Sequence, residues 1–200
     1  MTKSAPNLRD RDYLDRLRDY YAESRHIPSL KRICEMMGFA SKAAAKKMMH
    51  RLEGERFVER AADDAAWIPA RRFFERSLAM EAVPAGMPVA PGDTAGEPFM
   101  VDDYVVRSPS RTVMVPVKGD SMIDAGIHDG DVAVIERGRA AGRGDLVVAI
   151  VDNELTLKEL GLERGRFILK PRNPAFAVIR PKGELEIFGV MVGLIRRYRH

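Results

Sequence analysis

A stretch rich in proline and glycine near the middle of the chain most constrains its fold. It runs from residue 81 to residue 98 and contains Pro84, Gly86, Pro88, Pro91, Gly92, Gly96 and Pro98. A helix does not continue through so many of these residues, so the stretch predicts a linker or an exposed loop. Helical patterns precede it and strand-like runs follow it. We therefore expect an N-terminal domain over 1–70, a linker with an exposed loop over 71–98 and a C-terminal domain over 99–200.

Composition excludes several classes of protein. Hydrophobic residues make up 46% of the chain and charged residues 31%, which is ordinary for a folded soluble domain. No apolar run approaches the ~20 residues of a membrane-spanning helix, and the N-terminus lacks a signal-peptide core. The single cysteine, Cys34, excludes an intramolecular disulfide, and the four histidines are scattered. We expect a cytoplasmic protein with no membrane contact, no metal and no cofactor.

The first domain is predicted to contain three helices. Apolar and aromatic residues recur along one face of the first helix at Tyr13, Leu14, Leu17, Tyr20 and Tyr21. Ser29 is suited to begin a second helix, Gly38 to end it and Ser41 to begin a third. Two short helices joined by a tight turn with glycine form the helix-turn-helix pattern. The runs 57–59 and 67–68 then flank a turn, which predicts a β-hairpin wing.

Positive charge is concentrated in this domain. The formal net charge of the whole chain is only +4, yet six cations and one anion lie between residues 31 and 51. The cations are Lys31, Arg32, Lys42, Lys46, Lys47 and Arg51. We expect the third helix to enter the major groove of double-stranded DNA, with contacts from Ser41, Lys42, Ala43, Lys46, Lys47 and His50. A solvated helix surface is the alternative interpretation of the same charges.

The second half of the chain is predicted to be a mostly antiparallel β domain. Its strand-like runs cover 112–117, 131–136, 146–151, 155–160, 167–169 and 185–195. Turn residues such as Asp129-Gly130 and Asp152-Asn153 separate them. The predicted fold class is therefore α+β with two domains.

Two polar side chains in this β domain are candidates for chemistry. Ser121 follows Gly119 after a strand, at a tight turn that exposes its hydroxyl. Lys158 shares one face of its predicted strand with Thr156 and Leu160, and burial beside Leu160 disfavours its ammonium form. A neutral lysine accepts a serine proton, as in Ser–Lys nucleophiles. Considered one at a time, an ordinary turn serine and an ordinary strand lysine are the simpler interpretations.

Six short segments together resemble the LexA/UmuD family of self-cleaving Ser–Lys proteins, and the two-domain layout is similar to that of its LexA-type repressors. These segments are 83–88, 117–122, 126–131, 154–160, 169–176 and 189–196. The resemblance covers 83–198, with a weaker winged-helix likeness over 8–68. Each segment alone is unspecific, but their combination and order are highly specific. The resemblance implies the winged helix-turn-helix and a C-terminal domain of the LexA/signal-peptidase type.

The resemblance also implies an activity. Ser121 would be the nucleophile, Lys158 its general base, and the backbone N–H groups around Asp120 and Ser121 would receive the oxyanion. The bond cut would be Ala85–Gly86; Ala95–Gly96 is the strongest alternative, because Glu97 and Pro98 follow it. A RecA–single-stranded DNA filament would promote cleavage, which would release the operator. The resemblance further implies a homodimer, with strands over 189–198 as the candidate interface.

Two departures from the family pattern leave alternatives open. Ala43 and Ala45 stand where LexA-type proteins usually carry base-contacting residues, which puts the usual operator in doubt. Asp120 before the serine is closer to UmuD-type and phage-type members. The leading hypothesis is a repressor of DNA-damage (SOS) response genes. A phage-type or ligand-responsive repressor with a different trigger and a UmuD-like accessory factor for error-prone replication are the alternatives, the last disfavoured by the N-terminal domain.

Overall fold

The chain divides into two compact units in its computed structural model. The structure describes residues 8–62, 66–80, 82, 96–181, 183 and 185–198. The first unit covers residues 1–101 and the second covers 102–200. The expected scissile residues, Ala85 and Gly86, lie outside the described residues. The limits expected for the linker stay a prediction, and each unit is described by itself below.

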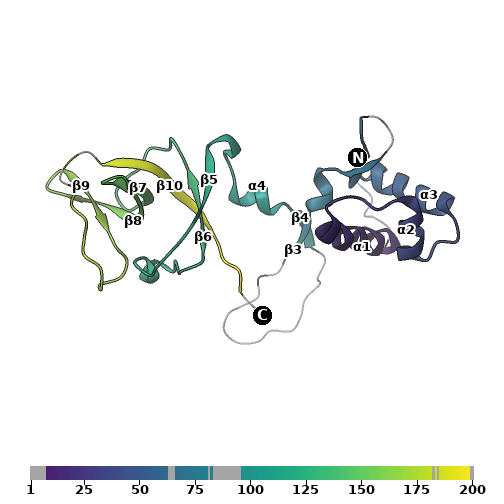
Figure 1. Cartoon of the computed structure of the whole chain (residues 1–200), viewed down its shortest axis with the longest axis horizontal. Coiled ribbons are helices and arrows are strands. Elements are labelled where there is room, and N and C mark those ends of the chain that lie inside the picture. Colours follow the sequence, from purple (N-terminus) through teal and green to yellow (C-terminus); the bar gives the residue numbers. More distant parts are fainter. Residues whose placement is uncertain are drawn as a thin grey trace. The chain divides into compact units, whose positions relative to one another are not determined.

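Three helices build the first unit (Figure 1): α1 (Leu8–Ser24), α2 (Leu30–Met37) and α3 (Lys42–Gly54). The predicted caps are present. The Ser29 hydroxyl accepts the Arg32 N–H, the Ser41 hydroxyl accepts the Ala44 N–H, and Gly38 ends α2 with a φ of +72°. Their inward faces form one core, which includes Leu14, Leu17, Ile33, Met48, Met49 and Leu52. The sequence therefore specifies these helix boundaries locally, because each cap satisfies N–H or C=O groups left free at a helix end.

A short hairpin follows α3, as the sequence predicts. Its strands are β1 (Val58–Arg60) and β2 (Trp67–Pro69), which pair antiparallel with Arg60 opposite Trp67. Phe57, Val58 and Trp67 are buried in the core that the helices form. The hairpin is thus part of the first unit rather than an appendage to it.

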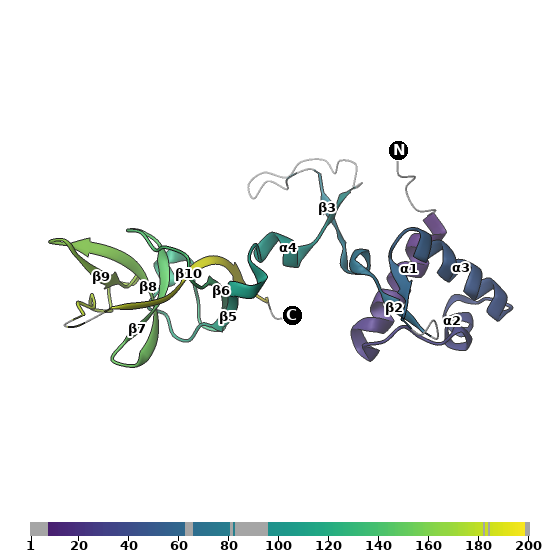
Figure 2. The same cartoon turned by 90° about the horizontal axis from the view of Figure 1, so that it is seen from above.

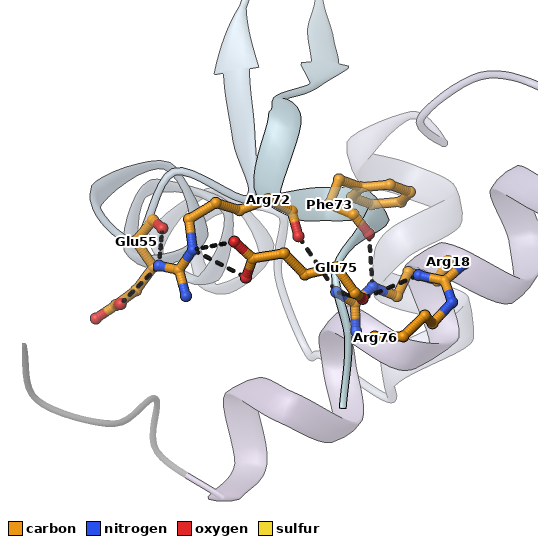
Figure 3. Close-up of polar contacts among 6 residues, drawn as sticks. All are labelled: Arg18, Glu55, Arg72, Phe73, Glu75 and Arg76. Carbon is orange, nitrogen blue, oxygen red and sulfur yellow. Dashed lines mark hydrogen bonds and ion pairs between the residues drawn. The ribbon is translucent and has the colours of Figure 1, made fainter. Parts of the chain in front are cut away.

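The chain leaves this hairpin through the 3₁₀ turn η1 (Arg71–Phe74), which two arginines hold in place (Figure 3). Arg18 on α1 donates to the carbonyl oxygens of Phe73 at 2.7 Å and Glu75 at 2.8 Å. Arg72 donates to the Glu55 carbonyl oxygen at 2.7 Å and pairs with the Glu75 carboxylate. Phe73 is only 2% exposed. Phe73, at the start of the expected linker, therefore belongs to the core of the first unit, and Arg72 forms hydrogen bonds that attach the 3₁₀ turn to this unit.

A second pair of strands was not expected. Residues in β3 (Arg76–Ala79) and β4 (Gly96–Phe99) form an antiparallel ladder in which Ala79 faces Gly96. The sequence predicts a loop across 81–98, and for Gly96 and Pro98 that expectation is wrong. Each strand of a two-stranded ribbon keeps one free edge, so a proline without an N–H is tolerated there. The two strands bring together the ends of the segment that contains the expected scissile bond.

The second unit is built on a six-stranded antiparallel sheet. Its strands are β5 (Thr112–Pro116), β6 (Val132–Glu136), β7 (Leu146–Val151), β8 (Glu154–Glu163), β9 (Arg166–Lys170) and β10 (Glu186–Ile195). Their order is β5-β6-β10-β7-β8-β9, with β10 between β6 and β7 (Figure 2). Short helical turns α4 (Val101–Val105), η2 (Pro109–Arg111) and η3 (Ile123–Ala125) complete the described elements. The mostly antiparallel β domain is confirmed.

Close packing accounts for the central place of β10. Register shifts interrupt its pairing with β7 around Phe188 and its pairing with β6 around Val192. At Gly189 a Cβ atom would lie 2.6 Å from the Ile135 side chain, so only glycine permits this approach of two strands. Buried side chains of these three strands form two core clusters, one with Val147 and Val190 and one with Ile135.

Candidate active site and nucleic-acid interface

The second unit brings Ser121 and Lys158 into contact. Lys158 lies in the middle of β8, and Ser121 lies in the turn between β5 and η3. Lys158 Nζ is 2.9 Å from Ser121 Oγ, although 37 positions separate the two residues in the sequence. The hydrogen-bonded contact between a nucleophile candidate and a basic side chain is the geometry that activation of a serine requires.

Lys158 is buried on the face that strand alternation predicts. Its exposed fraction is 7%, and Leu160 on the same face is 1% exposed. Burial lowers the pKa of Lys158 below the ordinary lysine value, because an ammonium ion loses its hydration there. The neutral amine, which is the form able to accept a proton, is therefore easier to reach than in an exposed lysine.

Two further acceptors surround the amine. Lys158 Nζ donates to Thr156 Oγ1 at 3.0 Å and to the Leu157 carbonyl oxygen at 2.9 Å. A neutral amine has two N–H donors and one lone pair. With the two N–H groups held by these acceptors, the lone pair is left for the hydroxyl hydrogen of Ser121. Sequence reasoning placed Thr156 on the Lys158 face but gave it no part in the site.

The turn that carries Ser121 is fixed by its backbone. Gly119 has a φ of +85°, a conformation that favours glycine, and its N–H donates to Asp129 Oδ1 at 2.6 Å. Asp129 belongs to the segment 126–131 that the sequence analysis singled out. The expected tight turn before the serine is therefore present.

A buried ion pair lies next to this turn and was not predicted from the sequence. Asp131, 1% exposed, forms a two-point contact with Arg196 after β10, with N–O distances of 2.7 and 2.6 Å. Arg196 also donates to the Gly126 carbonyl oxygen at the end of η3. Hydrogen bonding to Arg196 lowers the pKa of Asp131 to about 2. The pair ties the C-terminal segment to the turns that follow Ser121.

The predicted DNA-contacting side chains lie on the surface of α3 and at its start. All six are exposed: Ser41, Lys42, Ala43, Lys46, Lys47 and His50. Arg51 pairs with the buried Asp10 of another helix, α1, at 2.6 Å, whereas Arg32 pairs within α2, with Glu35 at 3.2 Å. His50 Nδ1 lies 3.0 Å from Glu53, and its ring packs edge-on against Trp67 of the hairpin. Arg51 therefore joins α3 to α1, whereas the exposed lysines of α3 face solvent.

The described residues also bear on metal binding and on membrane insertion. Among them, no group of three or more His, Cys, Asp or Glu side chains could hold a metal ion. No helix in this part of the chain has the length and apolar character needed to cross a membrane.

Comparison with known proteins agrees with this geometry. Residues 78–192 match the family model Peptidase S24-like. The LexA repressor of Opitutus terrae is 39% identical over 191 residues, covering 92% of this chain and 94% of the relative. LexA repressor 2 of Pseudomonas putida is 35% identical, with 90% and 93% covered. LexA repressor 1 of Nocardia farcinica is 33% identical, with 97% and 94% covered.

A helical unit joined to a β domain that sets a serine against a buried lysine defines the class: a repressor that is also a serine peptidase. The chain belongs to the Peptidase S24-like family and, within it, to the LexA-type repressors. It is accordingly an SOS repressor that cleaves its own chain.

Proposed function

We propose that Ser121 is the nucleophile of the self-cleavage and Lys158 its general base. The observation that carries this proposal is the 2.9 Å contact between Ser121 Oγ and the amine of a lysine that is 7% exposed. The neutral amine takes the hydroxyl proton while Ser121 Oγ attacks the scissile carbonyl carbon. The resulting ammonium then gives a proton to the leaving amine, and water releases the acyl group from Ser121.

The scissile bond of this proposal is Ala85–Gly86. It lies in the connection between β3 and β4, whose pairing keeps the two ends of that connection together. The competing Ala-Gly bonds, which are 95–96, 125–126 and 141–142, each involve a glycine held by strand pairing or by a hydrogen bond. Gly96 pairs with Ala79 in β4, Gly126 ends η3, and the Gly142 N–H donates to Asp145. Peptide bonds held in this way are poor substrates, which supports the choice of Ala85–Gly86.

The first unit is proposed to be a winged helix-turn-helix that binds double-stranded operator DNA. The helix α3 would lie in the major groove, with Ser41, Lys42, Ala43, Lys46, Lys47 and His50 nearest to the DNA. The exposed Lys46 and Lys47 suit phosphate or guanine contacts. Ala43 has no hydrogen-bonding side chain, so we expect an operator that differs from the usual one of this family. Its site of action would be the cytoplasm, where the operator is accessible.

Two partners complete the proposal. A RecA–single-stranded DNA filament would act as the trigger that favours the cleavage-competent state. A second copy of the chain would pair with the first, so that two recognition helices meet two half-sites. Exposed apolar side chains on β5 and β10, including Met114, Val192 and Ile195, support the homodimer.

The experiment is an incubation of the purified protein at mildly alkaline pH, followed by mass spectrometry of the fragments. We expect two fragments that meet between Ala85 and Gly86, because alkali deprotonates Lys158. Ser121→Ala is expected to stay intact under the same conditions and to bind DNA as the wild type does. Equal cleavage of both proteins would overturn the assignment of Ser121, and fragments ending at Ala95 would overturn that of the bond.

A further inference from the structure

A segment outside the Ser–Lys pair holds the turn of the nucleophile. It follows β9 and includes Arg172 and Asn173. The Arg172 N–H donates to the Ser121 carbonyl oxygen at 2.8 Å, and the Asp124 N–H donates to the Arg172 carbonyl oxygen at 2.8 Å. The backbone of this segment therefore pairs with the turn on both sides of Arg172.

The side chain of Asn173 adds a third contact to the same turn. Its Nδ2 donates to the Asp120 carbonyl oxygen at 3.0 Å, and its Oδ1 accepts the Ala175 N–H at 2.9 Å. The second bond orients the amide group, so that its donor end faces the turn. The carbonyl groups of Asp120 and Ser121, on either side of the nucleophile, are both held by this one segment.

The segment is also fastened to the strand of the base. Arg172 Nε lies 2.5 Å from Glu159 Oε2, and Glu159 directly follows Lys158 in β8. The side-chain contact of Arg172 reaches the base strand, whereas its backbone reaches the nucleophile turn. The two halves of the catalytic pair thus share one support.

The contact at Asp120 has a consequence for the oxyanion. The peptide bond is planar and trans, so the carbonyl of Asp120 and the N–H of Ser121 point in opposite directions. The Asp120 carbonyl accepts the Asn173 amide at 3.0 Å and, within the turn, the Ile123 N–H at 3.2 Å. A carbonyl that is fixed in this way also fixes the direction of the Ser121 N–H. Within the described residues, that N–H donates no hydrogen bond.

We propose that Asn173 is a positioning residue, which orients the Asp120–Ser121 peptide so that the Ser121 N–H receives the oxyanion. The inference rests on the proposed role of Ser121. As Ser121 Oγ bonds to the scissile carbon, the carbonyl electron pair moves to oxygen and the hydroxyl proton moves to Lys158 Nζ. The oriented N–H stabilises the new negative charge, and Asn173 itself exchanges no proton.

Two substitutions in the full-length protein test this role. Asn173→Ala removes both side-chain bonds, whereas Asn173→Asp keeps the acceptor for Ala175 and loses the donor to Asp120. Asn153→Asp is the matched control, because it makes the same amide-to-carboxylate change in an exposed turn between β7 and β8. The measurements are self-cleavage rate against pH, the Ser121 amide signal in a ¹⁵N–¹H spectrum, and thermal unfolding.

We expect the alkaline plateau of the rate to fall about ten- to a hundredfold in both Asn173 variants. The pH midpoint of Asn173→Ala should stay at the wild-type value, because Lys158 keeps its surroundings. The Ser121 amide signal should move in both variants, whereas Asn153→Asp should match the wild type. A purely structural role would lower the unfolding temperature without this selective shift of one amide.

Plateau rates within about twofold of wild type in the folded variants would overturn the inference. A shifted midpoint with an unmoved Ser121 signal would also overturn it, since Asn173 would then act through Lys158. If neither variant folds, Asn173 is structural and the inference fails. The proposed function is tested separately by Ser121→Ala, and it fails if that variant still cleaves. If Ser121→Ala is inactive while both Asn173 variants cleave at the wild-type rate, only the role of Asn173 is refuted.

Discussion

The two units use lysine in opposite ways. On α3, Lys46 and Lys47 are exposed to solvent. In the second unit, Lys158 is buried against a serine, and burial lowers its pKa. A phosphate contact needs a positive charge that persists, whereas a general base needs an amine that gives up its proton. The environment of each lysine, and not its residue type, therefore suits it either to the proposed DNA contact or to the proposed role of general base.

The largest expected effect comes from making Lys158 permanently charged. Lys158→Arg keeps a cation beside Ser121, but a guanidinium is not deprotonated in proteins. We expect self-cleavage to fall by more than about a thousandfold. Gel analysis of the incubated protein measures this loss, and unchanged DNA binding shows that the first unit is intact. Cleavage near the wild-type rate would show that the reaction needs no neutral amine at position 158, which would contradict the role of Lys158 as general base.

The next effect concerns the stability of the second unit. Arg196→Ala leaves the buried Asp131 without its partner, so we expect the unfolding temperature of this unit to fall by several degrees. The pKa of Asp131 is lowered to about 2, so the pair stabilises the fold above the ordinary carboxyl value of about 3.9. That contribution is lost as pH falls through about 2.

Thermal unfolding of both proteins at several pH values checks this prediction. The difference between wild type and Arg196→Ala should be full at neutral pH and should shrink as the solution is acidified from about pH 4 toward 2. A difference that grows on acidification would contradict the assigned direction of the pKa shift. Lys42→Ala, on the exposed start of α3, should leave the unfolding of the second unit unchanged.

The smallest expected effect is on α3. Lys46→Ala and Lys47→Ala should each weaken DNA binding a few-fold and reduce the salt dependence by about one phosphate contact. Titrations of DNA at several salt concentrations measure both quantities. Self-cleavage should be unaffected, because neither lysine belongs to the second unit. An unchanged salt slope would mean that α3 does not face the DNA backbone.

Local signals made part of this fold predictable. Ser29, Gly38 and Ser41 mark the ends of α2 and α3 through contacts within a few residues. Short β-rich runs separated by turn residues identify the six strands of the large sheet. The pairing of β3 with β4 was not predicted, because β4 contains glycine and proline, which are typical of loops, and because its partner strand is distant in sequence.

The candidate sites were likewise only partly predictable from the sequence. The sequence identified Ser121 and Lys158 as candidates and predicted the burial of the lysine, since alternation places Lys158 beside Leu160. It placed Arg51 in the basic cluster of the first domain, although Asp10 binds it from 41 positions away. Asp131 and Arg196 are 65 positions apart, and no local pattern joins them. Interactions between segments that are distant in sequence could therefore not be predicted and became visible only in the folded structure.

The dependence of the self-cleavage rate on pH tests the central claim most directly. If the buried Lys158 deprotonates Ser121, the rate rises with pH and levels off at a midpoint below the ordinary lysine pKa of about 10.4. The midpoint should follow Lys158, so Lys158→Arg should show no such rise. A wild-type rate that is independent of pH, or one that falls as the solution becomes alkaline, would contradict the account.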